Sequence, residues 1–142
     1  VGLFNIVGTY GAGWLGDRFS KPKLLMALYG SRGIAIIAFL LLPLSTYTVY
    51  AFGVIMGLLW LSTVPLTNGI VANMFGVKYL SMLSGIVFFT HQVGSFFGGW
   101  LGGVNHDLTG NYNAIWLCSI GLSILGVIVH FFVNEEAVIH DA

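Results

Sequence analysis

Five long apolar stretches, separated by only a few polar residues each, take up nearly all of this 142-residue sequence. Hydrophobic residues make up 57% of the chain and charged residues only 7%, which leaves too few polar side chains to cover a water-soluble globule of this size. A bundle of helices within a bilayer needs no polar cover, because its outer surface faces hydrocarbon. The sequence therefore predicts an all-α integral membrane protein built as a transmembrane helix bundle.

The apolar runs and the polar links between them predict where the spans lie. Five helices are expected at residues 1–16, 24–43, 49–75, 81–104 and 114–133. The first is short for a span at about 1.5 Å per residue, and the third contains Pro65, which we expect to kink it. Because the links are brief, neighbouring spans must run antiparallel. The chain also opens at Val1, inside an apolar run and without a methionine, so we expect a fragment of a longer protein.

The basic residues outside the spans indicate the orientation. The first link contains Arg18, Lys21 and Lys23. The third contains Lys78, whereas the second and fourth links contain no lysine or arginine. Positive charge favours the cytoplasmic side, so these two links and the tail at residues 134–142 are expected to be cytoplasmic, in a multi-pass protein of the cell (inner or plasma) membrane. Several aromatic residues cluster where the outer interface should then fall: Tyr47, Tyr50, Trp100, Tyr112 and Trp116.

One face of the fourth span carries small and polar side chains, and the opposite face carries bulky apolar ones. A step of about 100° per residue places the following residues on the small face: His91, Gly94, Ser95, Gly98 and Gly102. Glycines four residues apart let a second helix approach closely in lipid. Tight helix packing and a direct place on a transport pathway are equally consistent with this face, and one surface can serve both.

His91 is a candidate for substrate or proton handling. It lies roughly 15 Å from the cytoplasmic end of its span, where a charged side chain is costly, and histidine changes charge most readily near neutral pH. The alternative is a neutral histidine hydrogen-bonded to a neighbouring helix. Ser95 shares its face, while Gln92 points sideways, where helix packing is the more ordinary role.

Arg32 is the one intramembrane side chain that is certain to be charged. Its helical neighbours form an apolar stripe, and it lies roughly 12 Å from the cytoplasmic edge. It could snorkel to that edge, pair with a helix outside this sequence, or clamp an anionic substrate. The candidates for a substrate or proton pathway are therefore His91, Gln92, Ser95 and Arg32.

Several classes of site are excluded. The net charge is zero with neutral histidines, so nothing points to nucleic acid. The single cysteine, Cys118, cannot form an intrachain disulfide, and no cysteine or histidine pairing has the spacing of a zinc site. The glycines of residues 11–16 match a dinucleotide fingerprint, but they end a membrane span and no acidic residue follows at the required distance. Neither a cofactor nor a metal is expected.

Residues 13–23 resemble the signature that joins paired spans in the major facilitator superfamily. The matching positions are Gly13, Asp17, Arg18 and Lys23. Two positions depart from the signature, because Ser20 replaces a glycine and Pro22 replaces a basic residue. The runs 90–103 and 107–112 look like the penultimate span and following loop of bacterial carriers of the monocarboxylate or oxalate–formate type. The resemblance covers essentially the whole chain.

The resemblance implies roles that spacing alone does not. Residues 1–142 would be a C-terminal membrane domain with spans eight to twelve of a twelve-span protein, whose N-terminal half is missing. The loop residues would act as a cytoplasmic gate: Gly13, Asp17, Arg18, Lys21 and Lys23. The third and fourth spans would border the pathway and the second and fifth would be peripheral. This favours His91 over Arg32 as a substrate contact.

These features predict a secondary active transporter that works by alternating access. The expected substrate is a small organic anion such as a monocarboxylate, with a proton or a counter-anion as the coupled species. The lipid bilayer and the missing N-terminal half are the other expected partners, and no enzymatic activity is expected. Two alternatives are a membrane-embedded enzyme that acts on a lipid through His91, and a structural membrane subunit. The enzyme lacks a second catalytic residue at matching depth.

Overall fold

A helix satisfies its main-chain hydrogen bonds within its own segment, which is what so apolar a sequence requires. The computed structural model describes residues 2–134 and 136, and these residues form helices and no strand. The six helices are α1 (Gly2–Gly16), α2 (Lys21–Leu41), α3 (Thr46–Trp60), α4 (Thr63–Phe75), α5 (Val77–Thr109) and α6 (Asn113–Phe131). The predicted all-α class is confirmed. Most of the tail predicted to be cytoplasmic, residues 135 and 137–142, lies outside the described residues.

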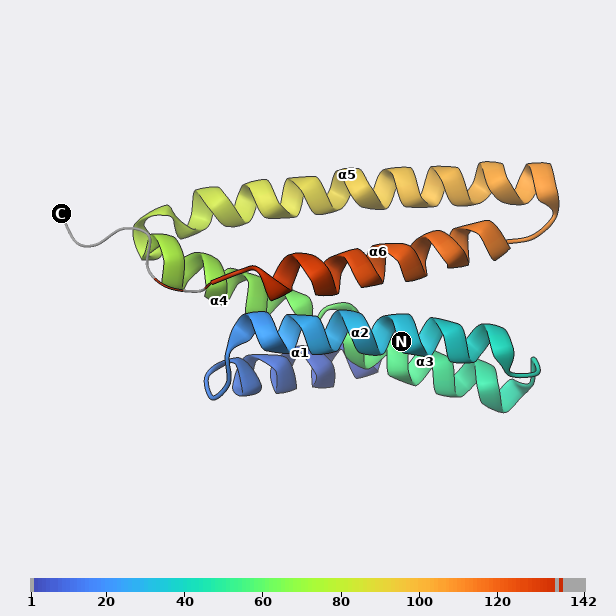
Figure 1. The fold of residues 1–142 in the computed structure, drawn as a ribbon, viewed down its shortest axis with the longest axis horizontal. Coiled ribbons are helices and arrows are strands. Elements are labelled where there is room, and N and C mark those ends of the chain that lie inside the picture. The colour runs from blue at the N-terminus through green and yellow to red at the C-terminus, as the bar shows by residue number, and fades with distance from the viewer. Residues whose placement is uncertain (1, 135, 137–142) are drawn as a thin grey trace.

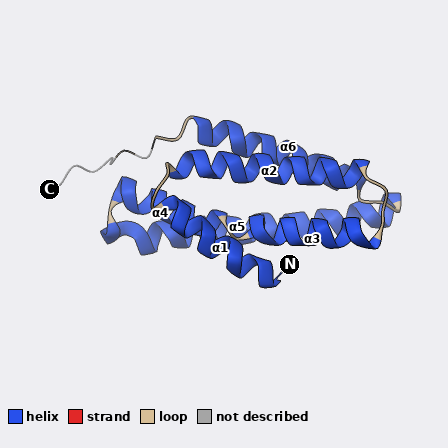
Figure 2. Cartoon of the chain, turned by 90° about the horizontal axis from the view of Figure 1, so that it is seen from below, coloured by secondary structure: helices blue, strands red, loops and turns tan. Residues whose placement is uncertain are grey.

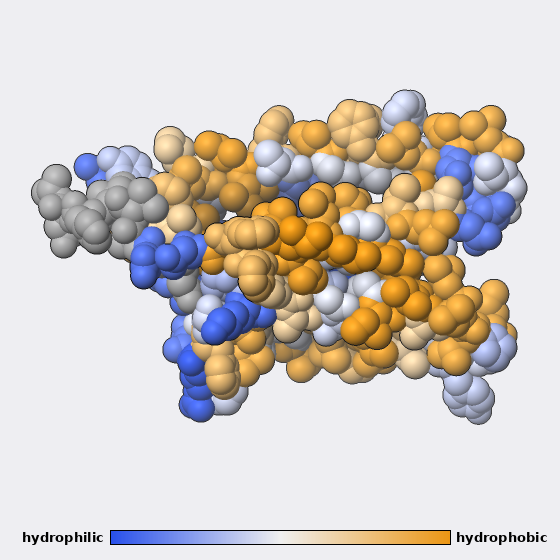
Figure 3. Space-filling model, viewed as in Figure 1, coloured by the Kyte–Doolittle hydropathy of each residue, from blue (hydrophilic) through white to orange (hydrophobic). Residues whose placement is uncertain are grey.

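Among the described residues, four stretches are long and apolar enough to cross a membrane: Lys21–Leu41, Thr46–Phe75, Val77–Thr109 and Asn113–Phe131. Helix α1 has 15 residues, fewer than the roughly 20 that a full span needs. Hydrophobic residues cover most of the long middle of the molecule, and hydrophilic residues gather toward its two ends (Figure 3). This distribution suits a bundle whose middle lies in hydrocarbon.

The third apolar stretch is interrupted. In place of one kinked helix over residues 49–75, the chain forms α3 and α4 with Leu61 and Ser62 between them. Pro65, where we expected the kink, lies a turn further on. It has no N–H to give to the Leu61 carbonyl, and its ring crowds that oxygen. The Val64 N–H bonds to the Leu61 oxygen instead, at 3.1 Å, and this tighter turn starts the new helix.

Two helices extend past the ranges expected from hydropathy. Helix α2 begins at Lys21, because Pro22 in its first turn has a fixed φ that suits a helix start. Helix α5 runs for 33 residues and continues past Val104 into the polar sequence that ends at Thr109. At its other end, Gly76 joins α4 to α5 with a φ of 73°, a conformation that favours glycine.

The helices pack in two layers (Figures 1 and 2). Helix α2 lies alongside α6 in the most extensive contact of the molecule, and α1 packs against α3 and α4. A buried cluster lies where α1, α2 and α4 meet; its members are Ala12, Leu25, Leu66 and Ile70. This cluster fixes the three helices around the start of α4, next to the interruption.

Helix α5 stands apart from the other helices. It packs against α4 and only lightly against α6, and no residue of its most apolar stretch is buried. In Figure 1 it runs along one edge of the molecule. Apart from Gly102, which is buried, the small face predicted on this helix is therefore open within the part of the chain that the structure describes.

Candidate functional site

The loop between α1 and α2 carries the residues expected to form a gate. Asp17, Arg18 and Lys23 are exposed. The Arg18 guanidinium lies over the Trp14 ring, 4.0 Å from its centroid, which is a cation–π contact. Within residues 2–134, no ion pair joins Asp17 to a basic side chain. The charge of Asp17 is thus left without a partner in this set of helices.

Lys21 lies against α4 rather than against the loop. Its side-chain carbons pack so closely on Gly69 that a methyl group added there would lie 2.6 Å from Lys21 Cε. Its ammonium donates to the Asn73 amide oxygen at 3.2 Å, in the amide orientation that satisfies both groups. This contact ties the loop to the second half of the interrupted stretch. Gly13, the first residue of the signature, lies in the last turn of α1.

The candidate pathway residues of α5 lie on an open surface. His91, Gln92 and Ser95 are all exposed. The nearest aromatic ring to the His91 imidazole is that of Phe88 on the same helix, with centroids 6.5 Å apart. The Ser95 hydroxyl donates to the His91 main-chain carbonyl at 3.0 Å, within its own helix. These side chains are available to a substrate or to another segment.

The glycines of the same helix have no close neighbour. A methyl group added at Gly94, Gly98 or Gly102 would meet no atom within 4 Å, although Gly102 itself is buried. The close helix contacts of the described residues lie elsewhere. One is between Gly33 and Ser123, where α2 meets α6.

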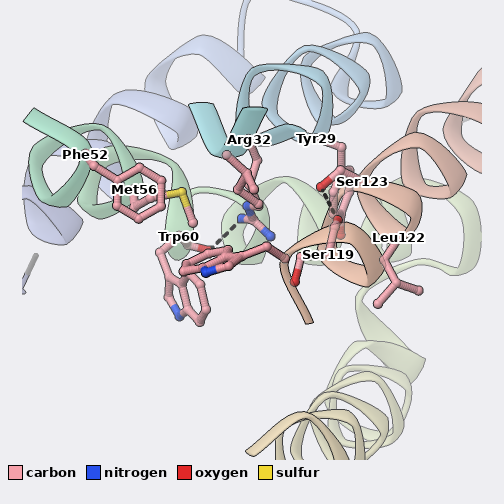
Figure 4. Close-up of a pocket in the computed structure, with 10 residues that line it drawn as sticks. Tyr29, Arg32, Phe52, Met56, Trp60, Ser119, Leu122 and Ser123 are labelled. Atoms are coloured by element: carbon pink, nitrogen blue, oxygen red, sulfur yellow. Dashed lines mark hydrogen bonds between the residues drawn. The ribbon is translucent and has the colours of Figure 1, made fainter. Parts of the chain in front are cut away.

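Arg32 faces a cavity of about 490 Å³ between α2, α3 and α6 (Figure 4). The walls are mainly aromatic and aliphatic, and no lining residue comes from α5. Ser119 and Ser123 also line it, but each hydroxyl donates to a carbonyl of its own helix at 2.9 Å. Arg32 is therefore the only charged group on this wall, and the structure does not bring it together with His91.

The Arg32 guanidinium turns toward the end of α3. Its Nη2 donates to the main-chain oxygens of Leu59, at 2.8 Å, and Trp60, at 3.2 Å. The guanidinium carbon also lies 5.4 Å from the Tyr29 ring centroid and 5.6 Å from that of Trp60. The Nε atom is buried and has no hydrogen-bond partner in the described structure. Arg32 thus bonds to backbone, an arrangement that none of the three sequence-based alternatives named.

Three further residues lie at the interruption between α3 and α4: Asn5, Gly8 and Ser62. The Leu61 N–H donates to the side-chain oxygen of Asn5 on α1, at 3.4 Å. The Ser62 hydroxyl donates to the Leu58 carbonyl. Gly8 lies against the same carbonyl, so closely that a side chain there would overlap it. Neither hydropathy nor motif spacing singles out Asn5, Gly8 or Ser62. An amide in an apolar segment, such as that of Asn5, is the one available signal, because such groups bond across helices in lipid.

Comparison with known proteins adds the family. The family model described as "Major Facilitator Superfamily" matches residues 1–141. The chain is 30% identical over 145 residues to an uncharacterized MFS-type transporter of Bacillus subtilis, covering 96% of this chain and 35% of that protein. It is 28% identical over 137 residues to monocarboxylate transporter 13 of Rattus norvegicus, covering 92% of this chain and 32% of that protein.

A third relative is similar over the same extent. Monocarboxylate transporter 12 of Xenopus laevis is 29% identical over 150 residues, covering 98% of this chain and 33% of that protein. The chain thus spans about a third of the length of the curated relatives it matches. No solved structure matches it.

Proposed function

Because this chain belongs to the Major Facilitator Superfamily, we propose that it is part of a secondary active transporter that moves a small solute by alternating access. The observation that carries the proposal is the family match over residues 1–141. It agrees with an all-helical, multi-pass membrane chain that has four apolar helices of spanning length among the described residues. The match and the transporter names of the relatives favour transport over a lipid-acting enzyme or a structural subunit.

The proposed substrate is a small organic anion, with a monocarboxylate as the best candidate. Support comes from two relatives that are named monocarboxylate transporters. The coupled species is a proton or a counter-anion, and the proposed partner half lies outside residues 1–142. These parts of the proposal rest on similarity and on the sequence.

The proposed pathway runs along α5. Its support is the row of polar and small residues that the open helix presents, with His91, Gln92 and Ser95 at its centre. Gly94, Gly98 and Gly102 would receive a further helix of the full-length protein, since nothing among the described residues fills the space beside them. The exposed loop residues Asp17 and Arg18 would form the gate with charges from the other half.

Uptake by the full-length protein tests the substrate. Purified protein in proteoliposomes should accumulate radiolabelled lactate or pyruvate when a pH gradient is imposed or when the same anion is loaded inside. A neutral sugar of similar size serves as the control solute and should not accumulate. If no monocarboxylate enters under either condition, the substrate assignment is wrong, although the family remains.

A further inference from the structure

The interruption between α3 and α4 exposes main-chain groups that a continuous helix would pair. The carbonyls of Leu58, Leu59 and Trp60 do not receive a main-chain N–H from the next turn, and the Leu61 N–H does not donate to one. A bilayer contains no water that could satisfy such groups, so each must find a partner within the protein. The partners that the structure supplies are therefore part of what keeps the interruption in place.

Those partners come from three separate elements. The Ser62 hydroxyl, within the interruption itself, donates to the Leu58 carbonyl. Arg32 on α2 donates to the carbonyls of Leu59 and Trp60. The side-chain oxygen of Asn5 on α1 accepts a hydrogen bond from the Leu61 N–H. These four main-chain groups are thus paired, and two of the three side chains that pair them, those of Arg32 and Asn5, lie more than 25 residues away in the sequence.

The charge of Arg32 also suits this place. The main-chain dipoles of α3 add up to a partial negative charge at its C-terminal end, where a cation is favourable. The guanidinium lies at that end and contacts the faces of two aromatic rings, those of Tyr29 and Trp60. Arg32 can therefore remain charged beside an apolar cavity without a carboxylate partner.

We propose that Arg32 and Asn5 are positioning residues: they hold the interruption at Leu61–Ser62 as a fixed bend in the third span, and Arg32 does not bind the substrate. The inference deepens the proposed function, because α4 leads directly into α5 and the bend sets the angle at which the proposed pathway helix is held. Without these partners, the angle between α3 and α4 would be less narrowly fixed, although the buried cluster at the start of α4 would still hold α4 against α1 and α2.

The test measures the angle of the bend directly, without substrate. For this test, Cys118 and every cysteine outside residues 1–142 of the full-length protein are replaced by Ser. The protein, in lipid nanodiscs, then carries spin labels at Tyr50→Cys on α3 and Val77→Cys at the start of α5, both strongly exposed positions. Arg32→Gln and Asn5→Ala should each at least double the width of the label-to-label distance distribution. Arg32→Lys, which keeps one donor group, should broaden it less.

Two matched variants separate the positioning role from other effects. Ser119→Ala lines the same cavity and should leave the distribution unchanged, because its hydroxyl bonds only to its own helix. Pro65→Ala restores an N–H for the Leu61 carbonyl and lets the helix run on. If Arg32→Gln alone does not fold, the pair Pro65→Ala and Arg32→Gln should recover folded protein. Unchanged widths in Arg32→Gln and Asn5→Ala, or failure of that recovery, would overturn the inference.

Transport then distinguishes positioning from substrate binding. In the proteoliposomes used for the uptake assay, Arg32→Gln should lower the kcat of monocarboxylate transport, with a KM that changes less than twofold. A KM raised tenfold or more for anions, with an unchanged distance distribution, would show a substrate clamp and overturn the inference. If the protein carries no monocarboxylate at all, the proposed substrate fails, while the distance measurement still decides the role of Arg32.

Discussion

Arg32 and His91 both lie within apolar helices, yet their surroundings differ. Arg32 donates to two carbonyls and contacts two aromatic rings, all supplied by neighbouring residues of the same bundle. His91 is exposed, and its ring is near only the ring of Phe88 on its own helix. An ionisable side chain within a span requires a partner or a function. His91 has no partner in the described residues, so it is the better candidate for proton handling.

Replacing His91 tests that role. His91→Gln keeps a polar side chain of similar size but removes the imidazole. We expect the dependence of monocarboxylate uptake on external pH, measured in proteoliposomes between about pH 5 and 8, to flatten by more than half. His106→Gln is the matched control, because His106 stacks on Tyr112 at the far end of α5, with centroids 4.6 Å apart. An unchanged profile in His91→Gln would remove His91 from proton handling.

At the scale of the helices, hydropathy and proline chemistry together predicted a disturbed third span but not its position or its partners. The break falls at Leu61–Ser62, and not at Pro65, because a proline disturbs the carbonyl four residues before it. Arg32 was recognisable as a charge within an apolar span, but its partners are main-chain oxygens, which carry no signal in the sequence. The contact of Asn5 with Leu61 depends on how α1 crosses α3, and only the assembled bundle defines that.

The approach of α1 to the interruption makes a prediction about stability. Gly8→Ala would place a methyl group against the Leu58 carbonyl and 2.8 Å from the Ser62 hydroxyl, so α1 would have to shift. We expect a loss of about 1–3 kcal/mol, the usual cost of overpacking, seen as a lower melting temperature of full-length protein in detergent.

Gly11→Ala is the control for that measurement. Gly11 lies one turn further along the same helix and has open space around it. Its replacement should be neutral or slightly stabilising, since alanine favours a helix over glycine by roughly 0.5–1 kcal/mol. Equal melting temperatures for the two variants would mean that α1 does not pack closely on the interruption in the purified full-length protein.

For the whole molecule, the positions of the charged residues indicate how the fold lies in a membrane. The hydrophilic residues gather toward the two ends of the long axis (Figure 3), and the apolar helices run between them. Basic residues of the α1–α2 loop and Lys78 at the start of α5 come to one end through the antiparallel course of the chain. Hydropathy and charge could predict the course of the helices and the end at which the basic residues lie, because the bilayer constrains both. The contacts between helices could not be predicted in this way, because they depend on how the side chains of neighbouring helices fit together.

This charge distribution predicts the orientation in a cell membrane. By the preference of positive charge for the cytoplasmic side, Lys78 should lie inside the cell and Asn111, in the α5–α6 turn, outside. In full-length protein in which Cys118 and every cysteine outside residues 1–142 are replaced by Ser, a membrane-impermeant maleimide applied to intact cells should label Asn111→Cys and leave Lys78→Cys unlabelled. Opening the cells with detergent should expose Lys78→Cys, which shows that the residue is reactive once reached. Labelling of Lys78→Cys in intact cells, with Asn111→Cys protected, would reverse the orientation and would place the Asp17–Arg18 loop on the outer side.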